Sequence, residues 1–170
     1  LQYASAGIGS FQHLSGELFK LTAGVNILHV PFKGGGPAMI DVIGGHTKVM
    51  FSSLVQTTPH IKTGKLRALG VGSKDRSKVL PDVPSLSETL PGYEARGWNG
   101  ILAPAGTPKP AIDRLHRELV KVVCSQEFGQ VLSAEGATAV GNTPAEFDAI
   151  IRADIKKWAK VIKDAGIRAE

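Results

Sequence analysis

The first seventy residues alternate between strand-like and helix-like segments, and this alternation constrains the fold more than any other feature of the chain. Short apolar runs alternate with segments whose apolar residues recur every three or four positions, and glycine or proline separates most of them. The predicted order is strand 1–5, helix 11–23, strand 25–32, helix 37–43, strand 48–52, helix 54–63 and strand 65–72. Such alternation predicts an α/β fold, with a mostly parallel sheet flanked by helices and right-handed crossovers.

The second half of the chain follows a different pattern. Residues 73–93 are rich in proline and polar side chains, which is typical of a connection between lobes. We therefore place a candidate boundary between 1–94 and 95–170. One more strand is predicted over 95–104.

Two helix starts follow that strand. Thr107 precedes a proline and is predicted to cap the first helix, whereas Thr143 and Glu146 form the sequence of a capping box. The helix after the capping box keeps its apolar period until Gly166. The single cysteine, Cys124, lies in the apolar pattern of the first of these helices, so we predict a buried structural thiol.

Composition excludes several classes of protein. With 170 residues, 42% of them hydrophobic, the chain can bury the core of one domain or of two small lobes, and it is too apolar to be a disordered polymer. No uncharged apolar run approaches the roughly 18 residues of a membrane span. The net charge of +5 comes from dispersed residues without a basic block, which favours small acidic ligands and argues against nucleic acid as a partner.

A loop of small residues, 5–10, follows the first predicted strand. Small residues let backbone N–H groups converge, and the N-terminus of the next helix adds partial positive charge, so the loop suits a carboxylate or phosphate oxygen. The loop lacks the third glycine of a dinucleotide fingerprint and the Gly-Lys-Ser/Thr of a P-loop. A tight structural turn explains the pattern equally well.

Two more loops follow strands in the same way. Lys33, Gly34 and Gly35 come after the second strand, where they serve as a plain connection or let a ligand approach the backbone beside a positive charge. Ser52 and Ser53 come after the third strand, where a hydroxyl suits a polar ligand or caps the next helix. Because ligands bind at the carboxyl ends of strands in open α/β sheets, the shared position of the three loops predicts a binding site there.

Catalytic and metal-binding motifs are missing from the sequence. The histidines form no His-Glu-x-x-His pair, Ser10 is not within Gly-x-Ser-x-Gly, and the carboxylates Glu17 and Asp41 have no evident partner. His13 lies one turn into the first helix, where it faces a cleft or packs at the edge of the core. We therefore expect a binding protein rather than an enzyme, with no cofactor and no metal.

Several blocks that span essentially the whole chain carry a family resemblance. They are YASAGIGS at 3–10, HVPFKGGGP at 29–37, GKLRAL at 64–69, LPDVPS at 80–85, PGYE at 91–94, LAPAGTP at 102–108 and WAKVIKDAGI at 158–167. Together they resemble the Bug family of bacterial extracytoplasmic solute receptors, the binding components of tripartite tricarboxylate transporters. The resemblance implies a two-lobed periplasmic-binding-protein fold of type II, with a small carboxylate held between the lobes by backbone amides.

The resemblance also assigns expected roles to individual residues. The candidate ligand-binding residues are Ser5, Ala6, Gly7, Gly9 and Ser10 as the grip, His13 beside them, Lys33, Gly34 and Gly35 as a wall, and Ser52 and Ser53 at the distal end of the ligand. Many relatives carry an acidic residue where this chain has Ser52, so an amine-bearing ligand is less favoured here. A periplasmic location and membrane transporter subunits as partners are implied by the same resemblance.

The family's first lobe begins with elements that precede Leu1. We therefore expect one complete lobe, the second, over 1–94 and only the returning part of the first lobe over 95–170. That part would expose an apolar surface, which we expect to associate with the N-terminal part of the first lobe or with another copy of the chain. Two alternatives stay open, a ligand-sensing effector domain of a transcription regulator and a parallel-sheet enzyme.

Overall fold

A three-stranded parallel sheet lies at the base of the molecule, as the computed structural model describes it over residues 1–168. The strands are β1 (Gln2–Ser5), β2 (Leu28–Pro31) and β3 (Val49–Met50), in the order β2-β1-β3. Tyr3 of β1 pairs with His29 on one side and with Val49 on the other. The central strand is therefore β1, which has a paired strand on each side.

Each strand leads into a helix, as the alternation of the sequence predicts. The helices are α1 (Phe11–Ala23), α2 (Gly35–Ile43) and α3 (Leu54–Lys62). The predicted stop of α1 is confirmed, since Gly24 adopts the left-handed conformation with φ of 65° and its N–H donates to the carbonyl of Lys20. Helix α2 begins two residues earlier than predicted, within the glycine-rich loop.

The core is built around two tyrosines. Tyr3 is fully buried in β1, and Tyr93 is almost fully buried at the end of the proline-rich connection. The Tyr93 hydroxyl donates to the carbonyl of Ser15 in α1 at 3.3 Å, and its ring packs edge-on against Phe19. The connection is thus attached to α1 through both the ring and the hydroxyl of one residue.

The predicted fourth strand over 65–72 is wrong. Only Val71 pairs there, as an isolated parallel bridge with Ser85, and its backbone bonds go to Pro84 and Leu86. The turn that follows contains the short 3-10 helix η1 (Leu86–Glu88). The apolar run of 65–72 suits a strand, but a strand needs a neighbour that satisfies its N–H and C=O groups, and this segment pairs at one residue alone.

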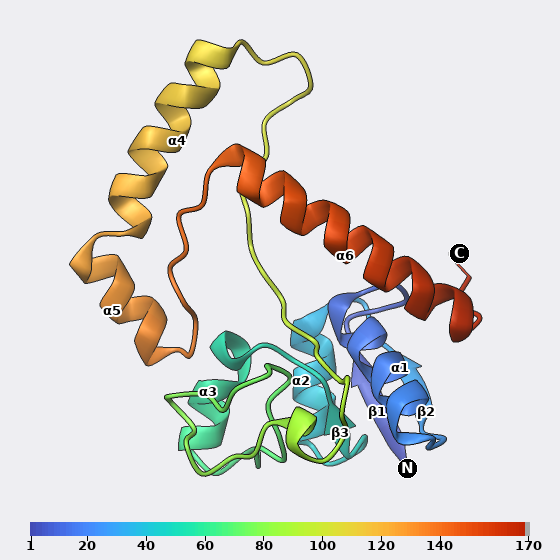
Figure 1. Cartoon of the computed structure of the whole chain (residues 1–170). Coiled ribbons are helices and arrows are strands. Elements are labelled where there is room, and N and C mark those ends of the chain that lie inside the picture. The colour runs from blue at the N-terminus through green and yellow to red at the C-terminus, as the bar shows by residue number, and fades with distance from the viewer. Residues whose placement is uncertain (169–170) are drawn as a thin grey trace.

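The predicted strand over 95–104 is wrong for the same reason. Ala95 donates to the carbonyl of Gly72, but beyond it the chain is extended and joins no ladder within residues 1–168. Ile101 and Leu102 are 69% and 72% exposed to solvent. Figure 1 shows this segment rising from the sheet past the start of α6 toward the upper end of α4, and the Trp98 ring packs edge-on against Phe147 of α6.

Three helices complete the chain: α4 (Lys109–Val123), α5 (Gln126–Ala134) and α6 (Pro144–Asp164). The capping box of α6 is confirmed, with the amide of Glu146 donating to the Thr143 hydroxyl and the Glu146 carboxylate accepting from the Thr143 amide. The N-cap of α4 is Pro108 rather than the predicted Thr107, whose hydroxyl instead donates to Pro104. Helix α6 crosses above α1 (Figure 1), where Trp158 packs edge-on against Phe11.

Helices α4 and α5 form an arm that extends away from the sheet (Figure 1). Neither helix has a buried residue, and Cys124 at the end of α4 is exposed, so the prediction of a buried thiol is wrong. The apolar face that favoured burial exists, but the described part of the chain covers it only in part, with Gly141 close to Cys124 and Val120. Helix α5 was not predicted, although the cap Ser125 and the spacing of Phe128, Val131 and Leu132 could have indicated it.

None of the helices in residues 1–168 is both long enough and apolar enough to span a membrane.

The packing of α1 on β1 can be tested at Gly16. A Cβ added to Gly16 would lie 2.4 Å from Tyr3 Cε2, so Gly16→Ala should reduce the free energy of unfolding by about 1–3 kcal/mol. Gly129→Ala in α5 is the matched control, because its Cβ would meet nothing within 4 Å and alanine favours a helix. Urea unfolding followed by circular dichroism measures both. Equal stability of Gly16→Ala and the wild type would contradict this packing.

Candidate ligand-binding site

The three predicted loops lie together at the carboxyl edge of the sheet, because β1, β2 and β3 are parallel neighbours. Backbone bonds join the first two loops directly: Phe32 N–H donates to Ser5 and Gly34 N–H donates to Ala6, both at 3.0 Å. Gly7, with φ of 125°, approaches the carbonyl of Phe32 so closely that a Cβ would lie 3.2 Å from that oxygen. This close approach requires glycine at position 7.

Three helices begin at this edge, so their N-terminal amides face the same region. Their N-caps are Ser10 for α1, Gly34 for α2 and Ser53 for α3. The free amides of a helix N-terminus and its dipole favour an anion. The edge therefore has the electrostatic character of an anion-binding surface.

The loop between β1 and α1, residues 6–10, uses several of its own amides. Gly7 N–H donates to Ser5 Oγ at 3.1 Å, Gly9 N–H donates to His13 Nδ1 at 3.0 Å, and Ser10 N–H donates to the carbonyl of Gly7 at 3.2 Å. The amides that donate to no protein group within residues 1–168 are those of Ala6, Ile8, Phe11 and Gln12. Ala6 was among the candidates, whereas the other three were not, because the sequence does not show which amides the loop itself uses.

Two glutamines also lie at this edge and were missed by the sequence patterns. A Cβ on Gly35 would lie 3.5 Å from Gln12 Nε2 and 3.6 Å from Gln56 Nε2, so both amides converge on the start of α2. Ser52 Oγ donates to Gln56 Oε1 at 2.9 Å. Gln12 and Gln56 each lie in the first turn of a helix that follows one of the loops, and this position could have identified them from the sequence.

A hollow of about 560 Å³ opens above the first two loops and beneath the end of α6. It is lined by Gly7, Ile8, Gly9, Pro31, Phe32, Lys33, Ile162 and Ile167. The lining is mostly apolar, and Lys33 is the residue that brings a full charge to it. The exposed Lys33 ammonium is therefore placed to attract an anion toward the loops.

The remaining candidates serve the local structure. Ser5 is fully buried, and the Ser10 hydroxyl caps α1 by accepting from His13 N–H while donating to Gly7 O at 2.7 Å. Ser53 starts α3 without a side-chain cap bond. His13 is 5% exposed and lines a second hollow, of about 290 Å³, rather than the one that Lys33 lines.

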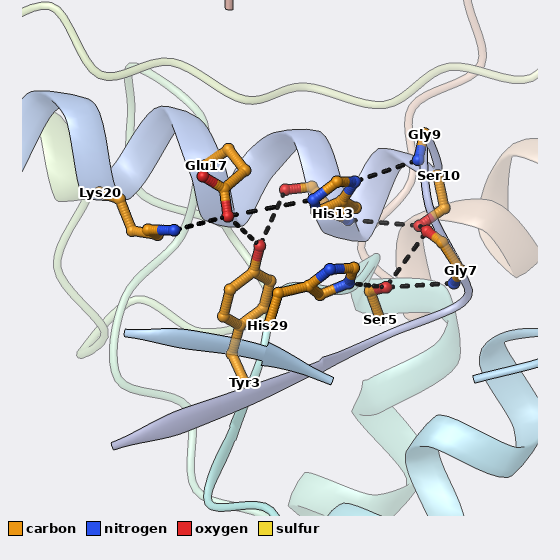
Figure 2. A network of polar contacts seen from close by, with 9 residues as sticks. All are labelled: Tyr3, Ser5, Gly7, Gly9, Ser10, His13, Glu17, Lys20 and His29. Atoms are coloured by element: carbon orange, nitrogen blue, oxygen red, sulfur yellow. Dashed lines mark hydrogen bonds and ion pairs between the residues drawn. The ribbon is translucent and has the colours of Figure 1, made fainter. Parts of the chain in front are cut away.

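A buried polar network lies between α1 and the strands β1 and β2, next to the loop (Figure 2). Tyr3 donates its hydroxyl proton to Glu17 Oε1 at 2.7 Å, and Lys20 Nζ lies 2.9 Å from the same oxygen. Burial and the contact with Glu17 raise the pKa of the Tyr3 hydroxyl well above its usual range. Glu17 thus links β1 to α1 as a carboxylate held by one hydroxyl and one ammonium.

Two histidines stack inside this network. The rings of His13 and His29 lie 3.9 Å apart at an angle of 10°, and His29 Nε2 is 2.6 Å from Ser5 Oγ. Burial lowers the pKa of His13, and burial together with the adjacent His13 ring lowers the pKa of His29 to about 4. Both rings are therefore neutral near pH 7. Within residues 1–168 no group of three or more His, Cys, Asp or Glu side chains is arranged to hold a metal ion.

Comparisons with known proteins agree with this geometry. The model of a family described as Tripartite tricarboxylate transporter family receptor matches residues 1–167. Protein BugT of Bordetella pertussis is 35% identical over 167 residues, which make up 98% of this chain and 51% of BugT. The chain spans about half the length of most curated relatives that it matches.

Solved structures match closely as well. R. palustris Rpa4515 with adipate has a TM-score of 0.92 at 34% identity, covering 98% of this chain and 56% of that one. The periplasmic binding protein BugD has a TM-score of 0.91 at 35% identity, covering 100% and 58%. MatC from Rhodopseudomonas palustris with bound malate has a TM-score of 0.88 at 30% identity, covering 95% and 56%. The predicted α/β fold of the periplasmic-binding-protein kind is therefore confirmed.

The neutral histidine pair predicts how stability depends on pH. The unfolded chain binds protons below pH about 6.5, whereas the folded chain resists them until pH about 4 at His29. Stability should be full above pH 6.5 and fall as the pH drops toward 4, with His29 contributing on the order of 1–3 kcal/mol and His13 adding a loss in the same direction. Urea unfolding between pH 7.5 and 4.5 measures the slope. His29→Gln should flatten it, and an unchanged slope in this variant would contradict the prediction.

Proposed function

Because this chain belongs to the tripartite tricarboxylate transporter receptor family, we propose that it forms one wall of a periplasmic binding site for a small carboxylate. The carboxylate is captured there and passed to the membrane subunits of a tripartite transporter. The observation that carries the proposal is the group of uncommitted amides at residues 6, 8, 11 and 12, beside the N-termini of α2 and α3.

A carboxylate fits this edge for a physical reason. Its two oxygens accept several hydrogen bonds each, and amides fixed on a rigid scaffold donate to them without rearrangement. Lys33 supplies a separate positive charge for a second carboxylate, and the apolar lining of the hollow suits a short methylene chain between the two. The adipate in the relative Rpa4515 and the malate in MatC are both dicarboxylates, which supports this ligand class.

The opposite wall comes from outside the described residues. We assign residues 1–94 to the second lobe and residues 95–170 to the returning part of the first. The exposed Ile101 and Leu102, together with the absence of buried residues in α4 and α5, support pairing of this part with the N-terminal elements of the longer relatives or with a second copy.

Binding without chemistry is the activity that these groups favour. The hydroxyls of Ser5 and Ser10 are engaged in holding the loop, and the relatives bear the names of receptors and periplasmic binding proteins. Recognition by amides and one lysine requires no cofactor.

The proposal can be tested by titrating the ¹⁵N-labelled chain with millimolar adipate or malate. Shifts of the Ala6, Ile8, Phe11 and Gln12 amides are expected, because these donors are uncommitted. Lys33→Gln should weaken binding about 3–10-fold through the loss of one exposed charge, and high salt should reduce the difference. Lys62→Gln, at the far end of α3, is the matched control and should bind as the wild type does.

The neutral diamide of adipic acid tests the role of charge, and it should shift none of these amides. Equal binding of diamide and diacid, or no shift with any carboxylate, would contradict the proposal.

A further inference from the structure

The contact between Gly9 and His13 fixes the protonation state of the histidine. Gly9 N–H lies 3.0 Å from His13 Nδ1, and because an amide nitrogen only donates, Nδ1 must be the unprotonated, accepting nitrogen. The ring proton is therefore on Nε2, which lies 4.0 Å from Glu17 Oε1. A second proton on this ring would have to enter at Nδ1, where it would face the Gly9 N–H.

The same contact controls the orientation of the loop. Gly9 has φ of 75°. Its N–H belongs to the peptide bond between Ile8 and Gly9, and the N–H of Ile8 itself is one of the uncommitted amides. On the other side the loop is held by Ser10, whose N–H and hydroxyl both donate to Gly7. The His13 ring is therefore the side chain that sets the middle of the loop (Figure 2).

We propose, on the basis of the carboxylate site proposed above, that His13 is a positioning residue that holds residues 6–10 in their ligand-binding form only while its imidazole is neutral. Protonation of His13 turns Nδ1 into a donor, breaks the contact with Gly9 and lowers the affinity of the site for a carboxylate.

Charged and titratable groups surround His13 on every element packed against it. Glu17 and Lys20 face it from α1, Tyr3 from β1 and His29 from β2, and Arg168 after α6 lines the same hollow of about 290 Å³. Glu17 is the one group in this set that would favour the imidazolium, and it is already bonded to Tyr3 and Lys20. Burial lowers the pKa of His13, and Lys20 acts in the same direction against Glu17, so the ring is neutral near pH 7.

Protonation of His29, whose ring stacks on His13, does not break a contact with the loop. Its Nε2 contacts the Ser5 hydroxyl, which can donate or accept, so this contact survives protonation of the ring by exchanging the roles of its two atoms. Ser5 can then donate to Gly7 O at 3.2 Å and still accept from Gly7 N–H. His29→Gln is consequently the matched control for His13.

The test follows the ¹⁵N-labelled chain from pH 7.5 to 4.5. The Gly9 amide signal should shift with the same midpoint as the His13 ring protons, before any loss of the circular dichroism signal. Adipate affinity, measured at each pH, should fall at least fivefold more in the wild type than in His13→Gln. Glutamine accepts from Gly9 N–H but does not titrate, and the comparison at equal pH cancels the protonation of adipate itself. His29→Gln should keep the wild-type dependence.

A second comparison at pH 7 does not depend on acid stability. His13→Gln should bind adipate as the wild type does, whereas His13→Leu, which lacks the acceptor, should bind at least fivefold more weakly. Equal affinities of all three proteins, or a Gly9 amide that ignores the titration of His13, would overturn the proposal. If Gly9 follows His13 but no carboxylate binds at any pH, the positioning role is supported and the proposed function fails.

Discussion

Parallel pairing of β1 with both of its neighbours is the interaction on which the rest of the structure depends. It brings three strand ends, and therefore three helix starts, to one edge of the sheet. The same strand provides Tyr3 to the core and Ser5 to the base of the loop, and both are fully buried. Core and candidate site are consequently one unit, because a displacement of β1 would move the hydrophobic centre and the amides together.

The parts of the fold that rest on local chemistry could be predicted from the sequence. Ser10 and Gly24 delimit α1, and Thr143 with Glu146 starts α6, because caps act on amides and carbonyls within a few residues. The location of the candidate site could also be predicted, since it follows from the order of strands and helices rather than from any side chain.

The cap of α4 and the missed helix α5 are errors in local pattern, whereas the larger errors concern partners that are distant in the sequence. The runs 65–72 and 95–104 have strand-like composition, but a strand exists only where another backbone lies beside it. The buried environment expected for Cys124 needed a covering layer that the described residues supply only in part. The stacking of His13 on His29, and the use of the Gly9 amide by His13, join residues whose proximity only the folded sheet creates.

The arm formed by α4 and α5 is locally less stable than the sheet and α1. A helix of 15 residues that buries no side chain is held mainly by its own backbone bonds, which are marginal in water. The hydrogen-bonded amides of β1 and of α1 beyond its first turn, in contrast, exchange with solvent only when the core opens. The arm therefore opens at a lower cost in free energy than β1 and α1, the elements that flank the loop with the proposed carboxylate-binding amides.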